Sequence, residues 1–179
     1  MSAQFGIDKL VAEVAEEMGA QMRQANDFYT KRGFWTPIES LFFQAFLART
    51  EILNLREFKI AAYGAQRTED DAKDILTQSE EGTIRIFPQA QLPSWRVDFL
   101  IGVKAENDTG LWMIVECDGH AYHERTKEQA AKDRSRDRRF QAAGYQVFRF
   151  TGSELYRAPL KCATEVFDWL VQSYHRESS

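Results

Sequence analysis

Cysteines are scarce in this chain and long hydrophobic runs are absent, and both features limit what the protein can be. Cys117 and Cys162 are the only cysteines in 179 residues, so we expect no disulfide scaffold and a reducing, cytoplasmic location. No apolar run approaches the roughly 20 residues that span a bilayer, and the N-terminus lacks a signal-peptide pattern. We therefore expect a cytoplasmic protein without a membrane partner.

Positive charge is also in the minority, and it is unevenly distributed. The net charge of −4 argues against indiscriminate binding to nucleic acid. Residues 68–82 are strongly acidic, whereas residues 124–140 hold seven Lys or Arg against four Asp or Glu, a local charge of +3. One face of the protein could therefore meet a polyanion, or the basic segment could form a solvated helix with internal salt bridges.

The length suits one domain with an N-terminal appendage. Apolar residues at helical spacing predict a helix from about Phe5 to Tyr29, which the sequence Lys31-Arg32-Gly33 interrupts. We assign residues 1–34 to a helical extension packed on the core and residues 35–175 to the main domain.

The main domain alternates helical and strand patterns. Thr36-Pro37 with Glu39 is typical of a capping box and predicts a helix to about Leu55. Residues 58–63 are a candidate strand, and the acidic stretch after them is either a loop or a weak surface helix. The remaining predicted elements are strands at 83–92, 97–103 and 112–117, a helix at 126–143 ended by Gly144, a strand at 146–151 and a helix at 163–174. A turn-rich connector at 106–110 predicts that the second and third of these strands form an antiparallel hairpin.

Two carboxylates end the apolar segment 113–117. Strand alternation sends Glu116 and Asp118 to the same face, about 6–7 Å apart, and carboxylates crowded at a buried strand end usually persist because a cation holds them. Asp98 lies in another apolar strand, where an ion pair with Arg96, a residue on the next strand or a metal ion must neutralise it. The hairpin brings Asp98 near Glu116 and Asp118, and three carboxylates suit Mg²⁺ or Mn²⁺.

Other candidate groups have two interpretations each. Glu39 can fold back onto Thr36 as a cap and, at the edge of the apolar face of its helix, can also face a site. Cys117 with His120 and His123 could suggest zinc, but the strand would point Cys117 away from the carboxylates and no second Cys/His pair lies nearby. The two histidines fit a loop where an imidazole orients a water or contacts a phosphate, or surface positions with no role.

The helix at 127–140 carries basic residues on an arc beside Asp133 and Asp137. These basic residues are Lys132, Arg136 and Arg139. They either form ion pairs within the helix or line a phosphate backbone near the carboxylates.

Together these residues resemble the restriction-endonuclease-like PD-(D/E)XK superfamily, and within it small domains related to very-short-patch-repair endonucleases. The resemblance runs from about Thr36 to Leu170. Glu39 corresponds to the glutamate of the first core helix, Asp98 to the aspartate of the second core strand and Glu116 to the acidic residue of the third. The further matching positions are Asp118, Gly119, His120 or His123, Asp133, Arg136, Gly144, Tyr145, Val147, Arg149 and Phe150.

The resemblance implies an α/β fold, a mixed sheet of about four strands flanked by helices in the order α-β-β-β-α-β-α, and an endonuclease. Such an enzyme would hydrolyse phosphodiester bonds of double-stranded DNA with Mg²⁺ or Mn²⁺ and metal-activated water. Asp98 and Glu116 would bind the metal with the Cys117 carbonyl, while Asp118 and Glu39 would hold a second ion or orient waters. The residues that would grip phosphates are Lys127, Lys132, Arg136 and Arg139. Double-strand cutting would favour a homodimer.

One position departs from the superfamily pattern. Asp118 stands where the pattern has a lysine, so the duty of that lysine would fall to Lys132 or Lys127, to His120, or to a second metal ion. The missing lysine and the net acidity leave an alternative, a catalytically inactive nuclease-fold module that binds DNA or a protein partner. An RNA-processing nuclease with the same site is a third possibility.

Overall fold

The structure, a computed structural model, describes residues 3–30, 36–53, 58–64, 66–105, 110–119 and 127–177. Its elements are α1 (Ala3–Thr30), α2 (Pro37–Leu53), β1 (Lys59–Ala62), α3 (Glu69–Thr77), β2 (Thr83–Gln91), β3 (Arg96–Lys104), β4 (Gly110–Asp118), α4 (Lys127–Ala142), β5 (Gln146–Thr151), α5 (Gly152–Arg157) and α6 (Pro159–Glu177). The predicted core order α-β-β-β-α-β-α is present as α2, β2, β3, β4, α4, β5 and α6.

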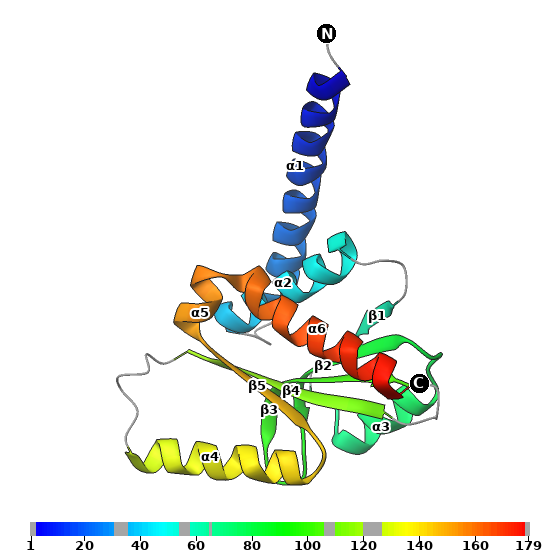
Figure 1. Cartoon of the computed structure of the whole chain (residues 1–179). Helices are drawn as coiled ribbons and strands as arrows, with labels where there is room; N and C mark the ends of the chain where they lie inside the picture. The colour runs from blue at the N-terminus through cyan, green and yellow to red at the C-terminus, as the bar shows by residue number, and fades with distance from the viewer. Residues whose placement is uncertain are drawn as a thin grey trace.

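The strands form one mixed sheet in the order β1-β2-β3-β4-β5 (Figure 1). β2, β3 and β4 are antiparallel neighbours, whereas β1 runs parallel to β2 and β5 runs parallel to β4. The α/β fold class and the antiparallel hairpin are therefore confirmed. The sheet has five strands rather than about four, because the candidate strand at 58–63 pairs with the edge of β2 as β1.

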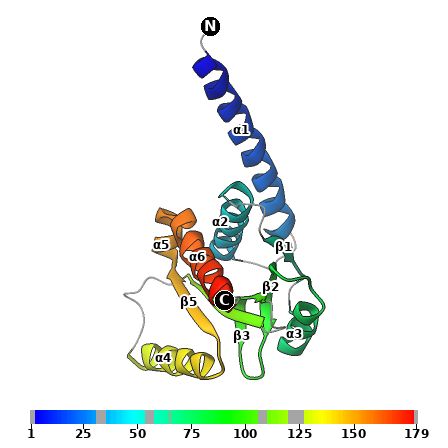
Figure 2. The same ribbon diagram turned by 45° about the vertical axis from the view of Figure 1, so that its right-hand side comes forward.

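Helices cover both faces of this sheet (Figure 2). α2, α5 and α6 pack on one face, and α3 and α4 pack on the other. Along β4, Val115 and Cys117 belong to the core beneath α2 and α6, whereas Ile114 belongs to the core that contains Phe140 of α4. Because side chains alternate along a strand, residues 116 and 118 point to the α4 side.

One of the two short helices was among the sequence-based alternatives, and the other was not predicted. The acidic stretch is a helix, α3, because Thr68 and Asp71 form a capping box whose side chains and backbone N–H groups bond reciprocally. A second capping box, between Thr151 and Glu154, starts α5 directly after β5, and the prediction lacks this helix. The predicted stop of α4 is confirmed, since Gly144 takes a left-handed φ of 88° just after the helix ends.

α1 projects from the rest of the molecule (Figure 1) and meets it mainly at α2. Its apolar stripe is exposed at Ile7, Leu10, Val11 and Val14, so this half of the stripe does not pack on the core. The boundary between extension and domain at residue 34 stays a prediction. Among the described residues, no helix combines the length and apolarity that a membrane span requires.

Phe42 joins α2 to the sheet, and truncating it tests this packing. Its ring is 1% exposed and lies 5.4 Å from Phe99 and 6.0 Å from Phe150, centroid to centroid. We expect Phe42→Ala to lower the free energy of unfolding by about 3–5 kcal/mol, because it removes buried surface and leaves a cavity. Urea denaturation measures the change. Tyr156→Ala, at a ring that is 67% exposed, is the control and should stay within about 0.5 kcal/mol of wild type.

Candidate active site

Asp98 and Glu116 lie where β3 and β4 separate. The β3–β4 ladder ends at the pair Phe99 and Val115, so the next residue of each strand has no ladder partner across this gap. The Asp98 carboxylate fills part of the gap, because its Oδ2 accepts a hydrogen bond of 2.7 Å from the N–H of Cys117. This bond stabilises the Asp98 carboxylate, and its donor lies on the next strand rather than on Arg96, which was one of the alternatives that the sequence left open. Burial still raises the pKa of Asp98, and the charge of Asp118 adds to the rise.

Glu39 reaches the same place from α2. The predicted capping box is confirmed: Glu39 Oε2 accepts from the N–H of Thr36 at 3.0 Å, and the N–H of Glu39 donates to Thr36 Oγ1 at 3.4 Å. The carboxylate is nonetheless 7% exposed, and its pKa is raised by burial and by the neighbouring charge of Asp98. Capping and proximity to the strand carboxylates therefore occur together.

Gln89 of β2 is a site residue that the sequence reasoning missed. Its amide Nε2 donates to Glu39 Oε2 at 3.2 Å, and the same side chain lowers the pKa of Asp98. Its φ is 51°, a left-handed conformation that costs a residue with a side chain about 1–3 kcal/mol. A glutamine in a strand carries no sequence signal for such a backbone.

Glu116 is the most perturbed carboxylate of the group. It is 6% exposed, and its Oε1 is buried without a hydrogen-bond partner among the described residues. Arg136 of α4 places a guanidinium nitrogen 3.5 Å from the other oxygen, Oε2. Burial, followed by repulsion from Asp98, raises the pKa of Glu116 to about 7 in spite of this arginine.

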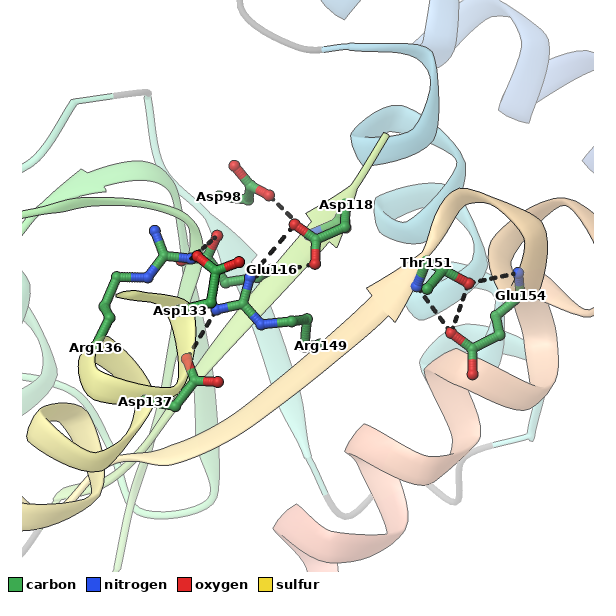
Figure 3. A network of polar contacts seen from close by, with 10 residues as sticks. Asp98, Glu116, Asp118, Asp133, Arg136, Asp137, Arg149, Thr151 and Glu154 are labelled. Atoms are coloured by element: carbon green, nitrogen blue, oxygen red, sulfur yellow. Dashed lines mark hydrogen bonds and ion pairs between the residues drawn. The ribbon is translucent and has the colours of Figure 1, made fainter. Parts of the chain in front are cut away.

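Asp118 belongs to a second ion-pair group, shown in Figure 3. Arg149 of β5 approaches both oxygens of Asp118, at 3.3 and 3.2 Å, and its other terminal nitrogen lies 2.8 Å from Asp137 of α4. Arg149 stands opposite Glu116 in the parallel β4–β5 register. One arginine therefore links β4, β5 and α4 beside the buried glutamate.

The described acidic groups outnumber the arginines that face them. Asp98, Glu116, Asp118 and Glu39 converge from β3, β4 and α2, and Arg136 and Arg149 are the guanidinium groups in contact with them. Oxygen ligands and excess negative charge suit a hard divalent cation. In the described part of the chain, however, no three His, Cys, Asp or Glu side chains are close enough together to hold one ion. A bound ion would therefore require the carboxylates to close in.

The zinc alternative has no support from the thiol. Cys117 is buried in the core beneath α2 and α6, on the opposite face from Glu116, and burial raises the pKa of its thiol well above the ordinary range. A protonated thiol that faces a hydrophobic core is unsuited to bind zinc. His120 and His123 lie outside the described residues.

The basic residues of α4 divide into two sets. Arg136 faces the sheet with Asp133 and contacts Glu116, so it is not on the solvent-facing arc with Lys132. Lys132 and Arg139 are exposed, and the Arg139 guanidinium lies over the ring of Trp95, 5.6 Å from its centroid. Arg136, rather than Lys132, is thus the basic side chain of α4 that reaches the carboxylates. The side chain of Lys127 lies outside the described residues.

Comparison with known families identifies one family that the chain matches. The model of the restriction-endonuclease-like family REase_MTES_1575 matches residues 72–170, more than half of the 179 residues. The matched segment contains Asp98, Glu116 and Asp118, whereas Glu39 precedes it. No curated protein and no solved structure matches the chain.

The raised pKa of Glu116 predicts a pH-dependent cost to stability in metal-free protein. Its pKa is about 7 in the folded chain against 4.5 ordinarily, so its stabilising contribution is complete below about pH 4.5 and is lost as the pH rises through about 7. Gln does not titrate. We therefore expect Glu116→Gln to gain stability relative to wild type between about pH 5 and pH 8, by at most about 3 kcal/mol.

Urea denaturation in EDTA across this pH range measures that difference. Glu165→Gln, at an exposed glutamate of α6, should follow the wild-type pH profile. A stability difference for Glu116→Gln that does not change with pH contradicts the assignment of a strongly perturbed carboxyl.

Proposed function

The chain belongs to the restriction-endonuclease-like family REase_MTES_1575, and from this premise we propose that it is a metal-dependent DNA endonuclease. The observation that carries the proposal is the environment of Glu116. This carboxylate is buried beside Asp98 and keeps one oxygen without a hydrogen-bond partner among the described residues. A divalent cation would satisfy that oxygen and offset the repulsion between the two carboxylates.

Asp98 and Glu116 are the side chains that we propose hold the ion, with the carbonyl of Cys117 as a further ligand. When bound, Mg²⁺ or Mn²⁺ supplies Lewis-acid chemistry, which lowers the pKa of a water and offsets charge at phosphorus. Glu39 and Asp118 would orient waters or contribute to a second ion site. The motif Glu116-x-Asp118-Gly119 also supports the finer placement near very-short-patch-repair endonucleases in the PD-(D/E)XK superfamily.

Arg136 is our candidate for part of the role of the missing strand lysine, which is to stabilise the charge that develops at phosphorus. Its guanidinium lies 3.5 Å from Glu116, and it could move to a phosphate oxygen once a cation neutralises that carboxylate. A guanidinium stabilises developing negative charge well but does not accept a proton from water. The proton would therefore go to a carboxylate, and Glu39, whose pKa is raised by burial, is suited to receive it.

α4 would contact the DNA backbone with its solvent-facing residues. Lys132, Arg138 and Arg139 are exposed along this helix, which covers the sheet face on which Glu116 lies. Such contacts would position double-stranded DNA by its phosphates without reading its sequence.

The rival function is a nuclease-fold module without catalysis, which binds DNA or a protein partner. Two observations favour it: Arg136 and Arg149 already neutralise Glu116 and Asp118 in part, and no three ligating side chains are grouped among the described residues. Such a module need not bind Mn²⁺ at Asp98 and Glu116.

Asp98→Asn and Glu116→Gln test the enzyme proposal with little change of shape. We expect each to reduce Mg²⁺-dependent plasmid nicking at least about 100-fold, because each removes charge from the proposed metal site. Asp70→Asn, at an exposed aspartate of α3, is the matched control and should nick like wild type. Full activity in either site variant rules out the assignment. Wild-type protein that neither nicks DNA nor takes up Mn²⁺ in calorimetry supports the module instead.

Lys132→Ala tests the DNA contact separately from catalysis. We expect weaker binding to duplexes of any sequence. We also expect the slope of the logarithm of the DNA-binding constant against the logarithm of the salt concentration to become shallower by about 1, because one phosphate contact is lost. Fluorescence anisotropy in EDTA measures both. Lys161→Ala, at an exposed lysine of α6 on the other face of the sheet, should behave like wild type, and an unchanged slope for Lys132→Ala removes α4 from the interface.

A further inference from the structure

Gln89 interrupts an otherwise regular ladder opposite Asp98. The β2–β3 register pairs Pro88 with Phe99 and Ala90 with Val97, so Gln89 and Asp98 face each other, but the ladder skips this one pair. The left-handed backbone of Gln89, with φ 51°, accounts for the skip. On its other side, β3 pairs with β4 only from Phe99 onward, so Asp98, which precedes Phe99, has no β4 partner. Asp98 therefore has no ladder partner on β2 or on β4, at the position where its carboxylate meets the other acidic groups of the site.

The side chain of Gln89 is buried beside Glu39. It is 8% exposed, and its amide donates to Glu39 Oε2 at 3.2 Å. Its amide also lowers the pKa of Asp98, which faces it on β3. A neutral amide donor near two carboxylates lowers the cost of holding them together without adding a charge that would compete with a cation. The amide thus ties β2 to Glu39 of α2 at the position where Glu39 meets Asp98 of β3.

We propose that Gln89 is a positioning residue that holds Glu39 against Asp98, and that its strained backbone is retained for this purpose. The effect that we expect of Gln89 on metal binding rests on the proposed function. Strain that persists at a buried non-glycine residue is expected where the local geometry serves a site. A purely structural glutamine would stabilise the fold, whereas this one holds like charges together in an unfavourable backbone conformation.

Gln66 provides a matched control in the same chain. It is the other described non-glycine residue with a positive φ, 68°, and its side chain is exposed. Its N–H donates to the carbonyl of Pro88, a bond that a glycine keeps. Gln66→Gly and Gln89→Gly therefore relieve the same type of strain, but only Gln89→Gly removes an amide from the site.

A double-mutant cycle in EDTA tests the contact without metal. We expect Gln89→Gly to raise the thermal unfolding midpoint more in the Glu39→Ala background than in wild type, because in that background the hydrogen bond to Glu39 is already lost, whereas the relief of strain and the loss of the interaction with Asp98 are the same in both backgrounds. Gln66→Gly should shift the midpoint equally in both backgrounds. Equal shifts for Gln89→Gly would overturn the positioning role, whatever the protein does with metal.

Calorimetric titration with Mn²⁺ then tests the consequence. We expect Gln89→Gly to weaken Mn²⁺ binding about 10- to 100-fold, as for other residues that orient metal ligands, with Gln66→Gly unchanged. If the Gln89→Gly protein is as stable as wild type and binds Mn²⁺ with wild-type affinity, the proposed link between Gln89 and the metal site is overturned. If wild-type protein binds no Mn²⁺, the proposed function fails, and the metal-free cycle still decides whether Gln89 holds Glu39.

Discussion

Repulsion among buried carboxylates is the constraint on which the arrangement of this end of the sheet depends. Asp98 and Glu116 stand side by side where two central strands separate, and burial raises the pKa of both. The charge of Asp118 adds to that repulsion, and three other neighbouring groups reduce the cost of burying the carboxylates. The N–H of Cys117 binds Asp98, Arg136 reaches Glu116 from α4, and the Gln89 amide binds Glu39. One oxygen of Glu116 is still without a partner among the described residues, which is the position at which a cation would complete the balance.

The same constraint explains why the site needs so many elements. Alternation along β4 assigns Cys117 to the hydrophobic core and Glu116 with Asp118 to the α4 face, so a single strand serves both packing and chemistry. Arg149 then joins Asp118 to Asp137, which fixes α4 against the sheet through charge, with Phe140 buried close by. If these arginines are to contact DNA phosphate, a cation must first replace them at the carboxylates. Metal binding and phosphate binding would therefore be coupled in this protein.

Local patterns predicted the elements well, because each depends on nearby residues. The Thr36–Glu39 box, the glycine stop after α4 and the alternating strands are such cases, and the structure bears out all three. The predicted metal group of Asp98, Glu116 and Asp118 stays a prediction: the three carboxylates interact through their charges, but no three ligating side chains are grouped around one position among the described residues. Contacts between distant elements could not be predicted in this way: the choice of Arg136 over Lys132 depends on how α4 is rotated against the sheet, and the left-handed Gln89 depends on a tertiary arrangement that offsets its strain. α5 was missed because it is a helix of only six residues that follows β5 without a loop.

A crystal structure of the protein soaked in Mn²⁺ would show whether Asp98 and Glu116 bind a cation, because manganese is located by its anomalous scattering. We expect one strong peak between the carboxylates of Asp98 and Glu116, with the Arg136 guanidinium withdrawn from Glu116. An unoccupied site at saturating Mn²⁺, with Arg136 still paired to Glu116, would contradict a metal site and favour a binding module whose carboxylates are neutralised by arginine alone.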